Sequence, residues 1–162
     1  MEFHIRKARP EENKILTEIS LAAKRYWNYP EEYYAVWEKE LTITAAYIEK
    51  NQVFVAETKD NILGYCSITE VKKDFYAGKV LVKKGFWLEH IFVRTGFFQK
   101  GIGKRLIQSA EEYGRENKIA SLYVFAEPNA AGFYKKCGAH YLGESLSSIE
   151  GRIVPIYELF IG

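Results

Sequence analysis

The chain has 162 residues, of which 48% are apolar, 27% charged and 15% aromatic, and its net charge is +2. This length and apolar content suit a single domain over residues 1–162, and the small net charge gives no signal for a nucleic-acid or membrane partner. The two cysteines, Cys66 and Cys137, make no disulfide framework, and no Cys/His cluster has the spacing of a metal site. With no apolar leader and no run of about 18 apolar residues, we expect a metal-free cytoplasmic protein.

Strand and helix patterns alternate along the first half of the chain. Phe3 and Ile5 share one face of an extended segment, which predicts a strand over 2–8. Pro10 and the acids after it favour a helix start, and helical spacing of apolar residues continues to Tyr26. The further elements expected in this half are helices over 31–40 and 42–50 and a strand hairpin over 52–57 and 62–71.

The second half begins with a polar, lysine-rich stretch, residues 72–84, which we expect to be a loop. Aromatic and β-branched residues then predict a strand over 87–93. Apolar residues at helical spacing from Ile102 predict a helix that ends near Asn117. The remaining elements expected are a strand over 121–126, a short helix over 128–137, and an antiparallel strand pair over 140–146 and 152–161.

The expected order of elements is β-αα-βββ-α-β-α-ββ. The strand–helix–strand unit from Trp87 to Ala126 implies two parallel strands joined by a right-handed crossover. The hairpin over 52–57 and 62–71 and the last pair over 140–146 and 152–161 are expected to be antiparallel. We therefore predict an α/β (α+β) fold with a mixed central sheet of about seven strands flanked by helices.

Residues 99–104 form the loop and first turn of the helix that begins near Ile102. The first N–H groups of a helix have no partner within it, and the glycines Gly101 and Gly103 would let a ligand approach the main chain. Lys100 and Lys104 add positive charge. This combination predicts a pyrophosphate site.

Two common phosphate motifs do not fit this stretch. A P-loop needs Gly-x-x-x-x-Gly-Lys-Ser/Thr; counted from Gly96, Ile102 stands where the lysine is required. In the other register, Phe98 replaces the first glycine and Arg105 replaces Ser/Thr. A dinucleotide fingerprint fails because Leu106 stands at its third glycine. The sequence therefore disfavours nucleoside triphosphate hydrolysis.

The stretch Phe98-Gln99-Lys100-Gly101-Ile102-Gly103 resembles motif A of the GNAT family of acyl-CoA-dependent N-acyltransferases, Arg/Gln-x-x-Gly-x-Gly/Ala. The resemblance implies the GNAT fold over nearly the whole chain, with acetyl-CoA (coenzyme A) as cofactor. It also implies that 98–104, Lys104 included, bind the pyrophosphate. The departure is Phe98, which stands where the family usually has Arg or Gln. Since most phosphate contacts in the family come from backbone N–H groups, the departure removes at most one side-chain contact.

A second stretch resembles the later GNAT signature Asn-Ala-x-x-Phe-Tyr-x-x-x-Gly-Phe/Ala. It starts at Asn129 and reads Asn-Ala-Ala-Gly-Phe-Tyr-Lys-Lys-Cys-Gly-Ala. The resemblance implies that Asn129 contacts the pantetheine arm of the cofactor, with Phe133 beside it. It makes Tyr134 the general acid that protonates the departing thiolate. The alternatives are a helix N-cap for Asn129 and a core tyrosine for Tyr134.

An amine that attacks a thioester must first lose its proton, and the resulting oxyanion needs an N–H donor. The family resemblance implies that this donor lies on the strand before motif A, at Ile91, Phe92 or Val93. Glu89 is the first candidate for the base, acting through water, and His90 is its rival. Strand alternation puts the two on opposite faces, and the sequence does not say which face meets the acceptor. A surface carboxylate is the alternative for Glu89.

Aromatic residues are concentrated between Tyr26 and Trp37. In the GNAT family this region forms a wall of the acceptor site, which implies that Trp27, Tyr29 and Tyr33 line a pocket for a cationic amine. Glu89 would also face the acceptor. A helical hairpin that simply packs its own rings is the alternative.

We therefore expect an acetyl-CoA-dependent N-acyltransferase that acetylates a primary amine of a small molecule by direct attack in a ternary complex. Protein or peptide acetylation and a non-catalytic CoA-sensing domain are the alternatives. A nucleic-acid-binding module would use the lysines of 72–84, but such a loop is more often solvated. No nucleic-acid or membrane partner is expected, and the protein would be a monomer or homodimer.

Overall fold

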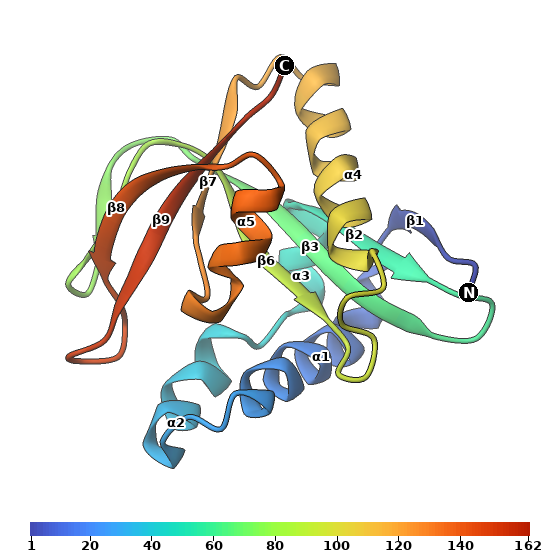
Figure 1. Ribbon diagram of the computed structural model, residues 1–162, viewed down its shortest axis with the longest axis horizontal. Helices are drawn as coiled ribbons and strands as arrows, with labels where there is room; N and C mark the ends of the chain where they lie inside the picture. Colours follow the sequence, from blue (N-terminus) through green and yellow to red (C-terminus); the bar gives the residue numbers. More distant parts are fainter. The chain divides into compact units, whose positions relative to one another are not determined.

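The computed structural model describes residues Met1–Gly162, and Figure 1 shows the elements in chain order. The strands are β1 (His4–Lys7), β2 (Gln52–Glu57), β3 (Ile62–Val71), β4 (Phe75–Ala77), β5 (Val80–Val82), β6 (Gly85–Val93), β7 (Ser121–Phe125), β8 (His140–Leu146) and β9 (Ile153–Phe160). The helices are α1 (Asn13–Tyr26), α2 (Glu31–Glu40), α3 (Ala45–Lys50), α4 (Ile102–Glu116) and α5 (Ala131–Lys136), with 3-10 turns η1 (Pro10–Glu12) and η2 (Pro128–Ala130). None of these helices is both long and apolar enough to span a membrane.

Seven strands pair in the order β1-β2-β3-β6-β7-β9-β8, and β4 and β5 form a separate two-stranded sheet. The strand pair β6–β7 is parallel, with Trp87 opposite Tyr123, whereas β1–β2, β7–β9 and β8–β9 are antiparallel. The expected mixed sheet of seven strands and the parallel pair around the crossover helix are confirmed. The chain also divides into two compact units, Met1–Ser67 with His90–Ala110, and Ile68–Glu89 with Glu111–Gly162.

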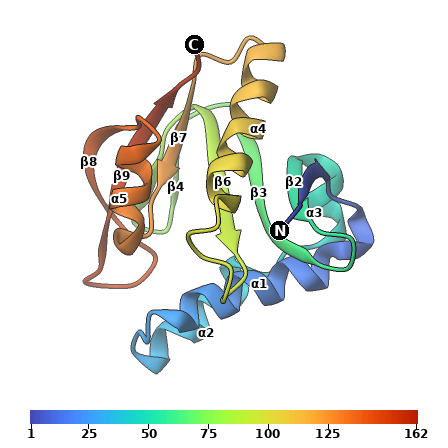
Figure 2. The same ribbon diagram turned by 45° about the vertical axis from the view of Figure 1, so that its right-hand side comes forward.

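The first unit has a core between the strands β2 and β3 and the helices α1 and α3, which Figure 2 shows beside them. Leu16 and Ile19 of α1 are almost fully buried, because helical spacing places them on one face of the helix. Tyr65 of β3 is fully buried in the same cluster, and its hydroxyl is hydrogen-bonded to Ser20 of α1. The alternation of β3 turns Cys66 the other way, with its Sγ 3.7 Å from the Leu106 carbonyl of α4.

The second unit is built around aromatic contacts between strands. The Trp87 ring of β6 stacks on Phe125 of β7, with 4.5 Å between ring centroids. Tyr157 of β9 is buried and stacks on Tyr134 of α5. Gly114 in α4 leaves room for the end of the chain, since a Cβ there would lie 2.2 Å from Cδ1 of Ile161. These contacts connect β6, β7, β9 and α5 within the unit.

The structure corrects one prediction and adjusts several boundaries. Residues 72–84 are not a plain loop, because β4 and β5 form a hairpin there around Gly78, which has a φ of +62°. The third helix begins at Ala45 rather than residue 42, after Thr44 accepts the N–H of Tyr47 as N-cap. The helices expected from Pro10 and Pro128 each open with a 3-10 turn. The last two helices also end one residue earlier than predicted.

Candidate functional site

In the first unit, a loop joins β6 to α4, and Arg94 anchors its start. The Arg94 N–H donates to the Leu63 carbonyl at 2.7 Å, and Arg94 Nε donates to the Ile62 carbonyl at 3.0 Å. Gly96 and Gly101 have φ values of +90° and +82°, in the left-handed region that disfavours side chains. The anchored start and the left-handed residues turn the chain sharply into α4.

The helix α4 opens with N–H groups that precede its first hydrogen bond. That bond runs from the Arg105 N–H to the Gly101 carbonyl at 3.1 Å, so the N–H groups of 102–104 lie ahead of the helical ladder. A Cβ built on Gly101 would meet no atom within 4 Å, so the main chain here is open to a ligand. Lys100 and Lys104 are both exposed. The open main chain, the positive end of the helix dipole and the two cations fit a diphosphate.

Phe98, at the departure from motif A, makes a ring contact instead of offering a polar group. Its centroid lies 4.9 Å from that of Tyr26 at the end of α1, with an interplanar angle of 88°. Tyr26 makes a second edge contact, to Trp27, also at 4.9 Å. Gln99, next in the chain, has a φ of +60°. Phe98 therefore lies directly before the turn into α4 and connects it to the end of α1.

In the second unit, Asn129 lies in the turn η2 and is bound to Glu127. Asn129 Nδ2 donates to Glu127 Oε1 at 2.9 Å, and Arg152 Nη2 donates to Glu127 Oε2 at 3.3 Å. The N-cap of η2 is Glu127 and that of α5 is Ala130, so Asn129 is the N-cap of neither helix. The motif pattern does not predict a role for Glu127, although its place directly before Pro128 is a signal for an N-cap. This carboxylate holds Asn129 in position.

Tyr134 lies in α5, and only 3% of its surface is exposed. Its ring stacks on Tyr157 at 5.4 Å with an interplanar angle of 20°, and Phe133 packs against its edge at 5.2 Å. The neighbouring rings fix the Tyr134 side chain through packing. The position of the phenol is therefore well defined, as a proton donor requires.

Glu89 and His90 are neighbours on β6 and belong to different units, Glu89 to the second and His90 to the first. Glu89 is exposed. His90 is half-buried, and its main-chain N–H donates to Ser67 Oγ at 3.2 Å. Aromatic rings surround its imidazole. The rings within 6.3 Å of the His90 centroid are those of Tyr47, Tyr65 and Phe92. Ile91, Phe92 and Val93, the predicted oxyanion donors, are half-buried in the first unit.

The aromatic segment of the first unit separates into two groups of rings. Tyr29 and Tyr33 pack on the buried ring of Trp37 at 5.1 and 5.6 Å. Trp27 instead contacts Tyr26. The rings of Trp27, Tyr29 and Tyr33 therefore do not form one continuous wall through direct ring contacts.

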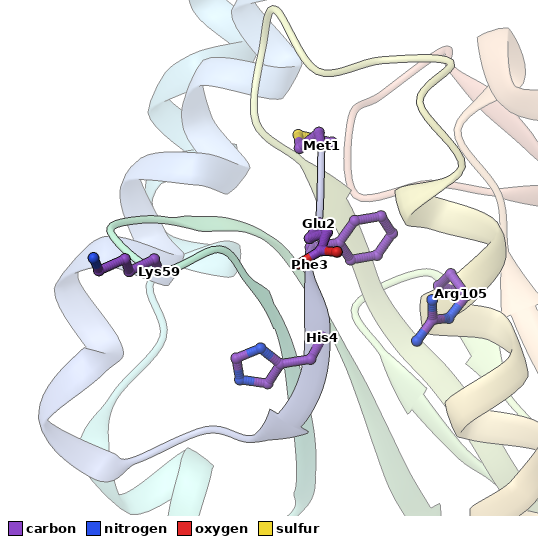
Figure 3. Close-up of a pocket in the computed structure, with 6 residues that line it drawn as sticks. All are labelled: Met1, Glu2, Phe3, His4, Lys59 and Arg105. Carbon is purple, nitrogen blue, oxygen red and sulfur yellow. The ribbon is translucent and has the colours of Figure 1, made fainter.

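A cavity of about 630 Å³ lies beside β1 and contains no predicted site residue. Figure 3 shows its lining, in which Arg105 Cζ lies 5.3 Å from the centre of the Phe3 ring. The lining residues are Met1, Glu2, Phe3, His4, Lys59 and Arg105. No group of three His, Cys, Asp or Glu side chains could hold a metal ion. Burial raises the pKa of the Cys66 thiol to about 12, which makes it a poor nucleophile at neutral pH.

Solved structures with the same fold cover almost the whole chain. A GCN5-related N-acetyltransferase from Rhodopseudomonas palustris matches with a TM-score of 0.77 and 18% identity, over 99% of this chain and 96% of that chain. PaiA N-acetyltransferase from Thermoplasma acidophilum, in complex with coenzyme A, has a TM-score of 0.72 and 19% identity, over 99% of both chains. A GNAT acetyltransferase from Brucella melitensis, in complex with acetyl-CoA, has a TM-score of 0.66 and 21% identity, over 99% of this chain and 89% of that chain.

No curated protein sequence matches the chain. The sequence model of the acetyltransferase (GNAT) family matches residues 16–139, which is more than half of the chain and contains both motifs. The GNAT fold and the acetyltransferase class expected from the sequence are confirmed. The chain belongs to the acetyltransferase (GNAT) family.

Proposed function

We propose that this protein transfers an acetyl group from acetyl-CoA to the primary amine of a small molecule, by direct attack in a ternary complex, with the whole chain acting as one domain. The observation that carries the proposal is the open turn into α4, where Gly101 has a φ of +82° and the N–H groups of 102–104 precede the helical ladder. Two relatives of the same fold were solved with coenzyme A or acetyl-CoA, which supports this cofactor.

The two motifs would bind different parts of the cofactor. Residues 99–104 would bind the diphosphate through main-chain N–H groups, with Lys100 and Lys104 adding charge. Asn129, held by Glu127, and Phe133 would contact the pantetheine arm. Acetyl-CoA supplies the activated acetyl thioester. Tight packing around Tyr134, which is 3% exposed, supports a fixed position of its phenol within the second unit.

Three groups of the chain would transfer protons or stabilise negative charge during the reaction. A base takes the proton from the attacking ammonium, and Glu89 is proposed for this role through a water molecule. Main-chain N–H groups of 91–93 would stabilise the negative charge on the thioester oxygen. The Tyr134 hydroxyl would give its proton to the thiolate as it departs.

Exposure favours Glu89 over His90 as the base. Glu89 is exposed and can work through water, whereas the His90 imidazole is surrounded by rings. Glu89→Gln should lower kcat by about 100-fold, in the range for removal of a general base, and His90→Gln should change it much less. The reverse order of effects would assign the base to His90.

Tyr29 and Tyr33 are proposed for the acceptor wall. Both are half-buried and pack on Trp37, so their rings keep little side-chain freedom. Glu32 and Glu38 on the same helix are exposed and supply negative charge for a cationic amine. Compact rings with acidic neighbours support a small acceptor rather than a protein surface.

Initial-velocity measurements on an amine panel test the proposal. Acetyl-CoA would be varied against polyamines, aminoglycosides, amino acids and peptides, with acetylated product identified by mass spectrometry. We expect turnover with one class of small amine and intersecting reciprocal plots, as a ternary complex requires. Parallel plots with an acetylated protein would refute direct attack. Turnover on peptides alone would assign a protein substrate, and cofactor binding without turnover would assign a sensing domain.

A further inference from the structure

Tyr26, Trp27 and Phe98 form a connected set of aromatic rings, which we call the aromatic trio. Tyr26 meets Phe98 edge-on at 4.9 Å and Trp27 edge-on at 4.9 Å. Tyr26 is 55% exposed and Trp27 is 41% exposed. Large aromatic side chains are normally buried, and Tyr34 and Trp37 of the neighbouring helix are only 7% and 3% exposed. The trio therefore offers aromatic surface to a ligand.

The trio begins where the proposed diphosphate site begins. Phe98 is followed directly by Gln99, and three peptide units separate it from Gly101. Three residues of extended chain span about 10 Å, so the trio lies within a nucleoside's reach of the N–H groups of α4. An anion site with an aromatic surface beside it suits a planar base attached to a diphosphate.

We propose that the aromatic trio stacks the base of a nucleoside diphosphate, which in acetyl-CoA is the adenine of its 3′-phosphoadenosine 5′-diphosphate part. The inference rests on the proposed function, because the trio would bind the same cofactor. It assigns Trp27 to the cofactor rather than to the acceptor wall expected from the sequence. Phe98 replaces the polar contact usual in motif A with a ring that supports the platform.

The surrounding charges favour a neutral base over a cationic amine on the trio. A cation on an aromatic surface is normally helped by a nearby carboxylate. The acid nearest along the chain, Glu31, is already paired with Arg25 at 3.4 Å. Where cations do lie over rings in this segment, they are the protein's own, with Lys24 4.5 Å from the centre of the Trp37 ring. These charges therefore favour the stacking of a neutral base on the trio over the binding of a cation.

Calorimetric titration with 3′-phosphoadenosine 5′-diphosphate tests the platform without the thioester or an acceptor. Stacking of one base on an aromatic side chain contributes enough for Trp27→Ala to weaken binding by between about five-fold and about a hundred-fold. Trp27→Phe keeps a ring and should stay near wild type. Tyr76→Ala, which removes a 69% exposed tyrosine of the hairpin β4–β5, is the matched control and should change nothing.

Tryptophan fluorescence gives an independent signal, because Trp27 is the exposed tryptophan while Trp37 and Trp87 are 3% and 5% exposed. The nucleotide should quench the wild type and should not quench Trp27→Phe, although that variant still binds.

Unchanged nucleotide affinity in Trp27→Ala would overturn the platform. A raised KM for the amine alone in this variant would also overturn it, because Trp27 would then line the acceptor site. Failure of the wild type to bind the nucleotide while it binds acetyl-CoA would also overturn the platform and leave the proposed function standing. Failure to bind acetyl-CoA at all would refute the proposed function itself.

Discussion

At the residue scale, Gly101 and Gly96 allow an effect on ligand binding at the diphosphate site to be distinguished from an effect of backbone strain. Both have positive φ, at +82° and +90°, and a Cβ on either would meet no atom within 4 Å. Alanine should therefore strain both turns by a similar amount, about 1–2 kcal/mol. Only at Gly101 would the added methyl face the ligand.

Gly101→Ala should raise the KM for acetyl-CoA about tenfold or more, and Gly96→Ala should leave it nearly unchanged, with the two variants losing similar stability. Steady-state kinetics and thermal unfolding measure the two effects. Equal effects of both variants on KM would mean that the site does not approach the main chain at Gly101.

Tyr134 can be tested against a second tyrosine that touches the same ring. Tyr134 and Tyr141 both contact Tyr157, at 5.4 and 5.8 Å, but Tyr141 is 57% exposed. Tyr134→Phe should lower kcat by about tenfold to a hundredfold with little change in the KM for acetyl-CoA, because a thiolate leaves moderately well without an acid. Tyr141→Phe should leave kcat unchanged. Full activity in Tyr134→Phe would make Tyr134 a packing residue.

The two motifs could be predicted from the sequence because they are local runs of residues. The partners of their side chains could not be predicted in this way. Glu127 binds Asn129 from two residues away, whereas Tyr26 meets Phe98 across 72 positions of sequence. The faces of Glu89 and His90 followed from alternation, but the rings around His90 come from β3 and α3, which only the folded chain brings near.

At the element scale, Arg6 links β1, η1 and β2 by ion pairs. Arg6 Nη2 lies 2.7 Å from Glu12 Oε2 and 2.6 Å from Glu57 Oε2. Hydrogen bonds from Arg6 hold the pKa of both carboxyls below the usual glutamate value. A lowered folded pKa gives stability that is complete above the unfolded pKa, about 4.3, and is lost as the pH falls through the folded pKa.

Arg6→Met should therefore cost about 3 kcal/mol of unfolding free energy at pH 7, because it removes the shortest ion pairs of Glu12, which is buried, and of Glu57, which is half-buried. The variant should also lose much of the wild type's decline in stability below about pH 4.3. Urea unfolding at pH 7, 5 and 3 measures both. A parallel acid decline in the wild type and the variant would show that these carboxyls do not control it.

Gly64 and Gly114 test two kinds of close approach. A Cβ at Gly64 would lie 2.7 Å from the Phe92 carbonyl oxygen, which belongs to the main chain of β6. A Cβ at Gly114 would meet the far end of the Ile161 side chain, which can change rotamer, rather than a main-chain atom. Gly64→Ala should therefore lower stability by about 1–3 kcal/mol, whereas Gly114→Ala should be nearly neutral, helped by the helix propensity of alanine. Equal losses would mean that Ile161 cannot move aside.

Element type could be predicted where the period was clear, and α2, β2, β3 and β8 have the bounds expected from the sequence. The hairpin β4–β5 was missed because its strands have only three residues each and lysines flank both. Its signal was present, since two β-prone runs lie on either side of Gly78-Lys79. In so short a stretch, the polar composition indicated a loop more strongly than these runs indicated strands.

At the scale of the whole molecule, strand order is the feature that local patterns predicted least. The parallel pair β6–β7 followed from the crossover, but the pairing of β1 with β2 joins His4 to Glu57 across the intervening helices. Register of this kind depends on which faces become buried together, and it needs the folded chain.

Charge is also uneven over the molecule. Five of the 23 basic residues lie within 72–84, the hairpin region, and its lysines are exposed. Since the net charge is only +2, we expect no retention on single-stranded DNA at physiological salt. Retention that falls steeply with salt, and that disappears when Lys72, Lys73, Lys83 and Lys84 are changed to Ala, would revive a nucleic-acid-binding role.

The most direct test of the central claim is calorimetric titration of acetyl-CoA into the wild-type protein. The open turn at Gly101, the N–H groups of 102–104 and the second motif together predict saturable binding of one cofactor per chain. Absence of binding at millimolar acetyl-CoA would contradict the account, because it would mean that the turn into α4 is an ordinary loop-to-helix entry and not a diphosphate site.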